Sequence, residues 1–182
     1  MQSYDYANRS GEEQISWERF AQLAARLAEQ IAAHQPDAVV GIARAGLVPA
    51  TVVACMLRRD LYPVRVSRRV QDEVQFERPV WRVDVSDEVA GKRVVVIDEI
   101  ADTGETLALV AARVRERGAA HVLTAALVSH SWASPAPDLA ALISDALVLF
   151  PWDQQVYQDD RWQPHPELVA ARLMQRSDDQ AT

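Results

Sequence analysis

The chain has 182 residues, 49% of them hydrophobic and 25% charged, which is enough apolar material for one globular domain and excludes wholesale disorder. Its 26 acidic and 19 basic residues give a net charge of −7, which argues against binding nucleic acid polymers or membrane surfaces but not against binding a small anion. The single cysteine, Cys55, excludes an intrachain disulfide, and no run approaches the roughly 18 apolar residues of a membrane span. We therefore expect one domain over residues 1–176, a frayed tail at 177–182 and a cytoplasmic location.

The predicted elements alternate between helices and buried strands. Helical spacing predicts helices over 16–34, 46–59 and 103–117, with a last short helix from Pro166. Apolar runs predict strands over 39–43, 61–67, 81–85, 93–98, 121–128 and 146–150, and the polar segment 68–79 is expected to be a loop. Buried strands separated by helices predict a mainly parallel sheet with helices on both faces. Because ligands bind such sheets at the carboxyl ends of the strands, the informative segments are those that follow Ala43, Ile97, Val128 and Phe150.

The segment after Ile97 combines two carboxylates with a tight turn. It reads Asp98, Glu99, Ile100, Ala101, Asp102, Thr103, Gly104, Glu105, Thr106, and a helix follows. Free N–H groups at the helix N-terminus, the helix dipole and two threonine hydroxyls make a cradle for an anion. The paired carboxylates suit vicinal hydroxyls or a metal ion instead. Together these groups describe a site for a ribose 5-phosphate, while a helix simply capped by Asp102 or Thr103 is the alternative interpretation.

This segment, VVVIDEIADTGET, resembles the signature of the type I phosphoribosyltransferases, which binds 5-phosphoribosyl 1-pyrophosphate (PRPP). It lacks the Gly-Lys-Ser/Thr of the Walker A loop and the G-x-G-x-x-G of the dinucleotide fingerprint. Residues 39–50 are similar to the first strand and the pyrophosphate loop of the same family, with Arg44, Ala45 and Gly46 at the strand end. Ala45 stands where the family commonly has glycine, and Arg44 on a plain surface turn is the alternative interpretation.

The segment from His130 onward resembles the base-binding end of the microbial xanthine–guanine and hypoxanthine–guanine branch. The similarity lies in Pro137-Asp138 and in Phe150-Pro151-Trp152-Asp153. Two positions depart from that branch. His130 aligns with the lysine that meets the exocyclic oxygen of a 6-oxopurine, and Leu147 aligns with the aromatic residue that stacks on the purine.

The resemblance implies a type I phosphoribosyltransferase-like fold, with a central mainly parallel sheet, flanking helices, and a small hood built from about 129–165 and the N-terminal segment. It also implies a pentosyltransferase of purine salvage that moves the 5-phosphoribosyl group from PRPP to a purine-type base. In the implied site, Asp98 and Glu99 hold the ribose hydroxyls and Mg²⁺. The 5-phosphate is cradled by Ala101, Asp102, Thr103, Gly104, Glu105 and Thr106, and the pyrophosphate is faced by Arg44, Ala45 and Gly46.

The remaining implied roles concern catalysis and the base. Asp102 is the expected general acid/base, and Arg69 is a candidate catalytic residue of the family's flexible loop, which corresponds to 68–79. The expected base-binding residues are His130, Trp132, Leu147, Val148, Trp152 and Asp153. A homodimer is expected because dimers are common among relatives.

Other interpretations stay open from the sequence. The chain could use a non-standard acceptor base, as the departures at His130 and Leu147 suggest, or it could be a non-catalytic PRPP or nucleotide sensor. The short, acidic chain argues against the sensor, which would need a partner domain or a basic face. For the individual side chains, a surface histidine at position 130 and plain packing of Trp132 and Trp152 are the alternatives.

Overall fold

The structure is a computed structural model that describes residues 9, 11–67, 69–70, 73–74, 80–166 and 168–169. The chain divides into two compact units, one comprising Gln22–Ile143 and the other comprising Met1–Ala21 with Ser144–Thr182. Each unit is described by itself. Among the described residues, no helix is both long enough and apolar enough to cross a membrane.

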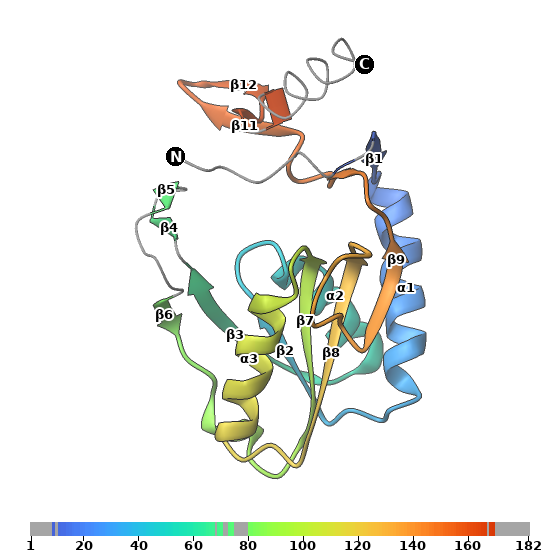
Figure 1. Cartoon of the computed structure of the whole chain (residues 1–182), viewed down its shortest axis with the longest axis vertical. Coiled ribbons are helices and arrows are strands. Elements are labelled where there is room, and N and C mark those ends of the chain that lie inside the picture. Colours follow the sequence, from blue (N-terminus) through green and yellow to red (C-terminus); the bar gives the residue numbers. More distant parts are fainter. Residues whose placement is uncertain are drawn as a thin grey trace. The chain divides into compact units, whose positions relative to one another are not determined.

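A six-stranded sheet forms the centre of the Gln22–Ile143 unit (Figure 1). Its strands, in spatial order, are β6 (Val80–Val83), β3 (Asp60–Ser67), β2 (Ala38–Ile42), β7 (Arg93–Ala101), β8 (His121–Ser129) and β9 (Leu139–Ile143). All neighbouring strands are parallel except β6, which pairs with β3 in the antiparallel sense at one edge. The mainly parallel sheet predicted from the buried strands is therefore confirmed.

The edge strand β9 was not predicted, and one side-chain pair explains where it begins. Asp138 Oδ2 accepts hydrogen bonds from Thr124 N at 2.7 Å and Thr124 Oγ1 at 2.8 Å, and Asp138 N donates back to Thr124 Oγ1 at 3.0 Å. These bonds set Leu139 opposite Ala125 of β8 in a parallel register. Asp138 therefore positions β9.

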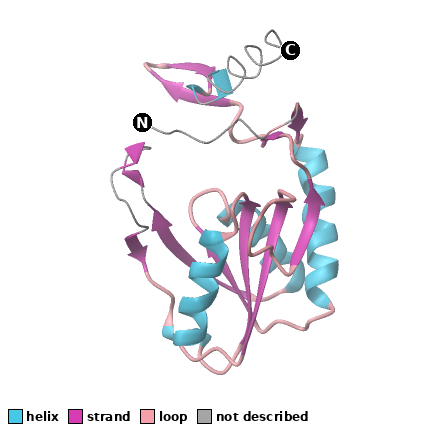
Figure 2. Cartoon of the chain, in the orientation of Figure 1, coloured by secondary structure: helices cyan, strands magenta, loops and turns pink. Residues whose placement is uncertain are grey.

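Helix α3 (Glu105–Glu116) covers one face of the sheet (Figure 2). Its buried side chains are Leu107, Val110, Ala111 and Val114, which pack in one cluster with valines of β2, β3 and β7. The helix begins after Gly104, whose φ is +84°, and it ends at Arg117 and Gly118. This helix confirms the predicted one, but it begins two residues later and ends one residue earlier than 103–117.

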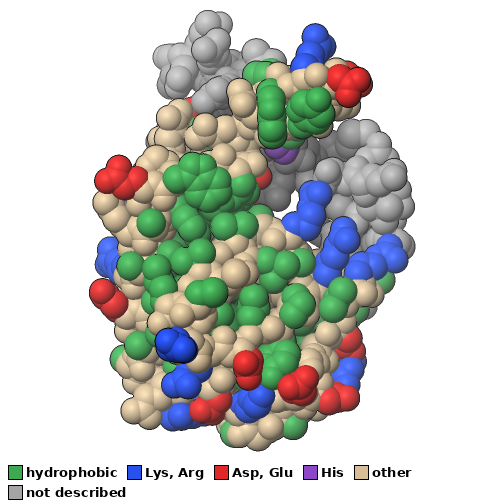
Figure 3. Space-filling view, turned by 180° about the vertical axis from the view of Figure 1, so that it is seen from behind, with side chains coloured by type: hydrophobic (Ala, Val, Ile, Leu, Met, Phe, Trp, Pro, Cys, Tyr) green, Lys and Arg blue, Asp and Glu red, His purple; other side chains and the backbone are tan. Residues whose placement is uncertain are grey.

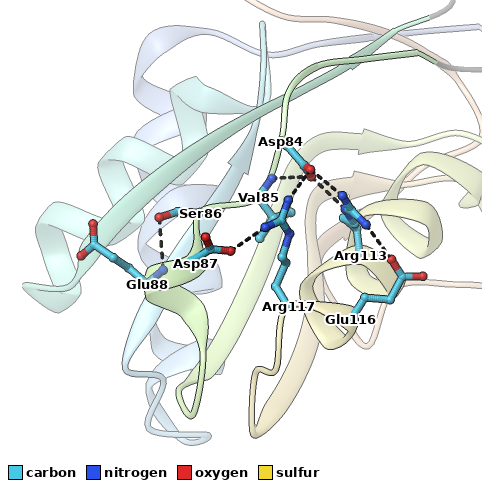
Figure 4. Close-up of polar contacts among 8 residues, drawn as sticks. All are labelled: Asp84, Val85, Ser86, Asp87, Glu88, Arg113, Glu116 and Arg117. Carbon is cyan, nitrogen blue, oxygen red and sulfur yellow. Dashed lines mark hydrogen bonds and ion pairs between the residues drawn. The ribbon is translucent and has the colours of Figure 1, made fainter.

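A charged network holds the last turns of α3 to the segment after β6 (Figure 4). Asp84 accepts from Arg113 Nε at 2.9 Å and from Arg117 Nη2 at 2.5 Å, and Arg117 Nη1 also donates to Asp87 at 2.5 Å. The Arg113 guanidinium holds the pKa of Asp84 well below its usual range. Asp87 opens the short 3-10 helix Asp87–Val89, whose preceding Ser86 accepts from Glu88 N at 3.3 Å.

Helix α2 (Leu47–Leu57) is apolar nearly all round its circumference. Pro49, Ala50, Val53 and Ala54 are its buried residues. It lies so close to β2 that a Cβ atom on Gly41 would be 2.8 Å from the Cβ of Ala50. Met56 on the same helix is exposed, and the face seen in Figure 3 shows hydrophobic side chains over a broad area.

Helix α1 (Trp17–Ala32) begins at the predicted cap. Ser16 Oγ accepts a hydrogen bond from Arg19 N at 3.1 Å, which satisfies one of the free N–H groups of the first turn. Leu23, Leu27 and Ile31 are fully or almost fully buried, as their helical spacing predicts.

The second unit contains two small sheets. Strand β1 (Glu12–Gln14) pairs in parallel with β10 (Leu147–Leu149), and β11 (Gln155–Gln158) forms an antiparallel hairpin with β12 (Arg161–Pro164). The segment 146–150 was expected to be a further strand of the central sheet, and this expectation was wrong because β10 pairs with β1 instead. The hairpin turns through Asp159 and Asp160, both with positive φ.

Two segments lie partly outside the described residues. Within the predicted loop 68–79, the structure describes β4 (Arg69–Val70) and β5 (Glu73–Val74), which pair in the antiparallel sense. The last predicted helix begins at Pro166 as expected, and its continuation beyond residue 169 lies outside the described part of the chain.

Candidate active site

The two carboxylates after Ile97 lie within β7, which continues to Ala101 instead of ending at Asp98. The strand is longer than predicted because the ladder with β8 continues to the pair Ala101–Ser129. Asp98 is buried, with 9% of its surface exposed, and its Oδ1 accepts from Glu99 N at 2.9 Å. Burial raises the pKa of Asp98 well above its usual range, and the neighbouring Glu99 carboxylate raises it further.

The loop after β2 meets this pair of carboxylates. A Cβ atom on Gly46 would be 2.5 Å from Asp98 Oδ1 and 2.5 Å from the carbonyl oxygen of Ile42, so only glycine fits there. Gly46 is also the N-cap of α2, with φ −61° and no side-chain hydrogen bond at that cap. Residues of the predicted pyrophosphate loop and of the predicted PRPP segment are therefore in contact.

The other members of the loop after β2 are more open. Arg44 is exposed and Ala45 is half-buried, and the peptide bond between Ala43 and Arg44 is cis. Ala45 does not adopt a left-handed backbone, so the replacement of a family glycine by alanine causes no positive-φ strain there.

The loop after β7 leads directly into α3. Gly104 is the N-cap of the helix and provides no side chain, while Thr103 Oγ1 accepts from Glu105 N at 3.3 Å. Thr103, Glu105 and Thr106 are exposed. The N-terminus of α3, with two threonine hydroxyls beside it, is therefore open to solvent at the carboxyl end of the sheet.

The loop after β8 lies on the loop after β7. His130 N donates to Ala101 O at 3.1 Å and Ser134 N donates to Thr103 O at 2.8 Å. A Cβ atom on Gly104 would collide with the carbonyl oxygen of Pro135 and lie 3.0 Å from its carbonyl carbon. We call residues 130–135 the capping loop. Its contact with Gly104 was not predicted, because nothing in the sequence pairs Pro135 with a glycine about thirty positions earlier.

Three side chains of these two loops form a compact group. Trp132 Nε1 donates to Asp102 Oδ1 at 3.3 Å, and His130 Nε2 lies 3.8 Å from the same oxygen. The His130 and Trp132 rings are stacked, with centroids 4.3 Å apart and planes 17° from parallel. His130 is buried, which excludes the alternative of a surface histidine, and Trp132 is 37% exposed.

The other expected base-binding residues lie in the second unit. Leu147 is buried in β10, Val148 is half-buried beside it, and Asp153 N donates to Phe150 O at 3.1 Å. Trp152 stacks on Phe150, with centroids 4.8 Å apart, and meets Phe20 edge-on at 5.3 Å. Their proposed contact with a base remains a prediction.

Arg69 lies in β4, and its side chain is outside the described part of the chain. Its catalytic role stays a prediction. In the described ranges, no three His, Cys, Asp or Glu side chains come together in a group suited to hold a metal ion.

Comparison with known proteins identifies the family. Residues 12–158 match the phosphoribosyl transferase domain, so the chain belongs to the phosphoribosyltransferase family. It is 30% identical to a xanthine-guanine phosphoribosyltransferase of Idiomarina loihiensis over 146 residues, which cover 79% of this chain and 88% of the relative. It is 32% identical over 145 residues to an enzyme of the same name from Nitratidesulfovibrio vulgaris, covering 78% and 85% of the two chains.

Solved structures agree with this assignment. A purine phosphoribosyltransferase from Pyrococcus horikoshii superposes with a TM-score of 0.70 and 30% sequence identity, covering 78% of this chain and 93% of that one. A xanthine-guanine-hypoxanthine phosphoribosyltransferase from Helicobacter pylori, at 18% identity, shares the fold with a TM-score of 0.64 over 78% of this chain and 91% of that one. The type I phosphoribosyltransferase fold expected from the sequence is confirmed.

Proposed function

We propose that this chain transfers the 5-phosphoribosyl group of PRPP to a ring nitrogen of a purine-type base and releases pyrophosphate. The observation that carries the proposal is the meeting of three loops at the carboxyl end of the sheet. Gly46 contacts Asp98 near the end of β7, and the loop after β8 is hydrogen-bonded to the loop that leads from β7 into α3. The similarity to enzymes named xanthine-guanine phosphoribosyltransferase supports a purine acceptor.

The chemistry exchanges two bonds at C1 of the ribose. The C1–O bond to pyrophosphate breaks, and the pyrophosphate leaves with the electron pair. A lone pair on the base nitrogen forms the new C1–N bond, and the base loses a proton. Since the transition state resembles an oxocarbenium ion, no enzyme nucleophile is needed, and catalysis depends on positioning and charge neutralisation.

Each part of the cluster has a role in this proposal. The amides and hydroxyls of Ala101, Asp102, Thr103, Gly104, Glu105 and Thr106 cradle the 5-phosphate. Arg44 and the backbone of Ala45 and Gly46 face the pyrophosphate, where positive charge and free N–H groups stabilise the leaving group. The side chain of Asp102, which is half-buried, exchanges the proton with the base, while its backbone belongs to the phosphate cradle.

The Asp98–Glu99 pair fits the ribose hydroxyls and a magnesium ion that arrives with PRPP. Burial raises the pKa of Asp98 and the neighbouring Glu99 carboxylate raises it further, and a nearby cation or hydroxyl donors would favour the ionised form of Asp98. Mg²⁺ usually binds through one or two carboxylates together with substrate phosphates. When bound, it would supply charge neutralisation for the pyrophosphate.

The base end of the site is the least conventional part of the proposal. From the sequence resemblance we propose base contacts for His130, Trp132, Leu147, Val148, Trp152 and Asp153, and a catalytic role for Arg69. The burial of His130, in place of an open cationic donor, is the specific observation that favours the second candidate, a transferase with a non-standard acceptor base. We also propose a cytoplasmic homodimer, which light scattering of the purified chain tests.

A base panel tests the function directly. PRPP and Mg²⁺ are incubated with guanine, hypoxanthine, xanthine or adenine, and pyrophosphate release is measured. Release with at least one of the four supports purine transfer. Release with none of them, but with another heterocycle, favours the non-standard acceptor. Binding of PRPP by calorimetry without release for any base identifies a sensor and overturns the proposed function.

The site itself is tested by Asp102→Asn. We expect this variant to keep the fold, since Asn preserves the side-chain volume, and to lose about a hundredfold or more in kcat. Near-normal turnover would remove Asp102 from the mechanism.

A further inference from the structure

We infer that Trp132 is a positioning residue for Asp102: its indole N–H fixes the carboxylate that exchanges the proton with the base. The inference rests on the proposed function, because it assigns Trp132 a task only if Asp102 takes part in the transfer. It adds to that function a residue from the next strand end, with a role that is distinct from stacking on the base.

The side-chain geometry is the first support. Trp132 Nε1 lies 3.3 Å from Asp102 Oδ1 and has a single proton to donate, so the bond selects one orientation of the carboxylate. Asp102 is partly shielded, with 35% of its side chain exposed, so water competes with this bond less than it would at an open surface. A hydrogen bond to a carboxylate oxygen is stronger than a neutral one of the same length, and at 3.3 Å this bond is at the long end of the ordinary range.

The packing of Trp132 against His130 is the second observation that supports the inference. Its indole rests on the imidazole of His130, with ring centroids 4.3 Å apart, and the His130 side chain is completely buried. An aromatic ring held between a buried ring and a hydrogen-bond partner has few rotamers left. At 3.8 Å from Asp102 Oδ1, His130 Nε2 is beyond a direct hydrogen bond, so His130 acts mainly by holding Trp132.

The backbone of the capping loop is the third support. His130 N is tied to Ala101 O, Ser134 N is tied to Thr103 O, and both acceptors flank Asp102 in the chain. The segments that contain Trp132 and Asp102 are therefore joined by backbone hydrogen bonds both before and after these two residues in the chain. A proton-transfer group needs this kind of fixed geometry, because small displacements cost large factors in rate.

The test is a double-mutant cycle in kcat. Trp132→Phe keeps a flat ring on His130 but removes the N–H donor, and Asp102→Asn removes the proton-transfer group. We expect Trp132→Phe to lower kcat about tenfold, equivalent to one hydrogen bond to a charged group, and to leave the KM for PRPP unchanged. In the Asp102→Asn background, the same change should lower kcat less than about twofold, because there is no carboxylate left to position.

Trp162→Phe is the matched control. Trp162 is 67% exposed on β12, meets Tyr157 and has no assigned role, so the kcat of this variant should equal that of the unaltered chain. Equal losses from Trp132→Phe in both backgrounds overturn the positioning role while leaving the proposed function standing. If the unaltered chain turns over no base, the proposed function fails, and the positioning role fails with it.

A second measurement does not require Trp132→Phe to fold. The chain has five tryptophans, and their indole N–H resonances can be assigned by elimination in ¹⁵N-labelled protein. We expect Asp102→Asn to shift the Trp132 resonance and to leave that of Trp162 in place. An unmoved Trp132 resonance overturns the inference, because the bond to Asp102 would then be absent in solution.

Discussion

Gly46 lies against the carboxylate of Asp98, so closely that any side chain at position 46 would occupy the space of Asp98 Oδ1. The contact joins the N-terminus of α2 to the carboxyl end of β7, two elements that come from distant parts of the chain. Both residues are buried, so neither can give way towards solvent. The geometry of the proposed PRPP site therefore depends on one missing methyl group.

Gly46→Ala should damage both stability and turnover. The new Cβ would lie 2.5 Å from Asp98 Oδ1 and from Ile42 O, and overpacking of this kind costs about 1–3 kcal/mol in the free energy of unfolding. Displacement of Asp98 should also lower kcat/KM for PRPP at least about tenfold. Urea unfolding and pyrophosphate release measure the two effects. Thr51→Ala, an exposed change on the same helix, should alter neither.

Gly104→Ala should cost more than an ordinary glycine replacement. Gly91 is the matched control, because its φ of +73° resembles the +84° of Gly104 but nothing lies within 4 Å of its missing Cβ. Both variants lose about 1 kcal/mol to left-handed strain, whereas Gly104→Ala also pushes Pro135 away. We expect only Gly104→Ala to reduce turnover. If both variants lost the same stability and kept full turnover, the contact between Gly104 and Pro135 would have no role in catalysis.

Asp37→Asn should show a pH-dependent loss of stability. Hydrogen bonds from Arg93 lower the pKa of Asp37 from 3.8 to about 2, so the folded state favours the carboxylate form. The stabilisation is therefore complete above about pH 4 and disappears as the pH falls through about 2. The melting temperature of Asp37→Asn should lie below that of the unaltered chain at pH 7, and the gap should close between pH 4 and pH 2. Glu29→Gln, an exposed change on α1, is the control for removing one negative charge.

Asp84→Asn should destabilise the chain because it leaves two guanidinium groups, those of Arg113 and Arg117, without their shared carboxylate. Both ion pairs of Asp84 are partly exposed, so salt screens them. The difference in melting temperature between Asp84→Asn and the unaltered chain should therefore be smaller in 1 M NaCl than at low salt. Glu116→Gln removes a 65% exposed partner of Arg113 and should have little effect. A larger effect at Glu116 than at Asp84 would contradict the network as described.

The sequence predicted the order of the main helices and strands because each has a strong local pattern. Helix α1 has its serine cap and its apolar stripe, and β2, β7 and β8 are continuous apolar runs. The exact end of β7 was missed, because two carboxylates in sequence favour a loop. The ladder with β8 overrides that local preference.

Other features depend on partners that the sequence does not name. The run at 146–150 predicts a strand, but its pairing with β1 depends on a three-residue segment with no pattern of its own. Strand β9 depends on the bonds between Thr124 and Asp138. The residues of the candidate site were predicted from a motif, whereas the burial of His130 follows from its stacking on Trp132 and from the fold of the capping loop.

The bonds between the capping loop and residues 101–104 also determine which segments can be exchanged between related proteins. Pro135 packs against Gly104, and the amides of His130 and Ser134 donate to the carbonyl oxygens of Ala101 and Thr103. A substitution that moves one loop therefore moves the other. If only the 130–135 segment of a relative were grafted into this chain, it would not match residues 101–104, against which it packs. The unit that can be recombined, by evolution or by an engineer, is the pair of strand ends together.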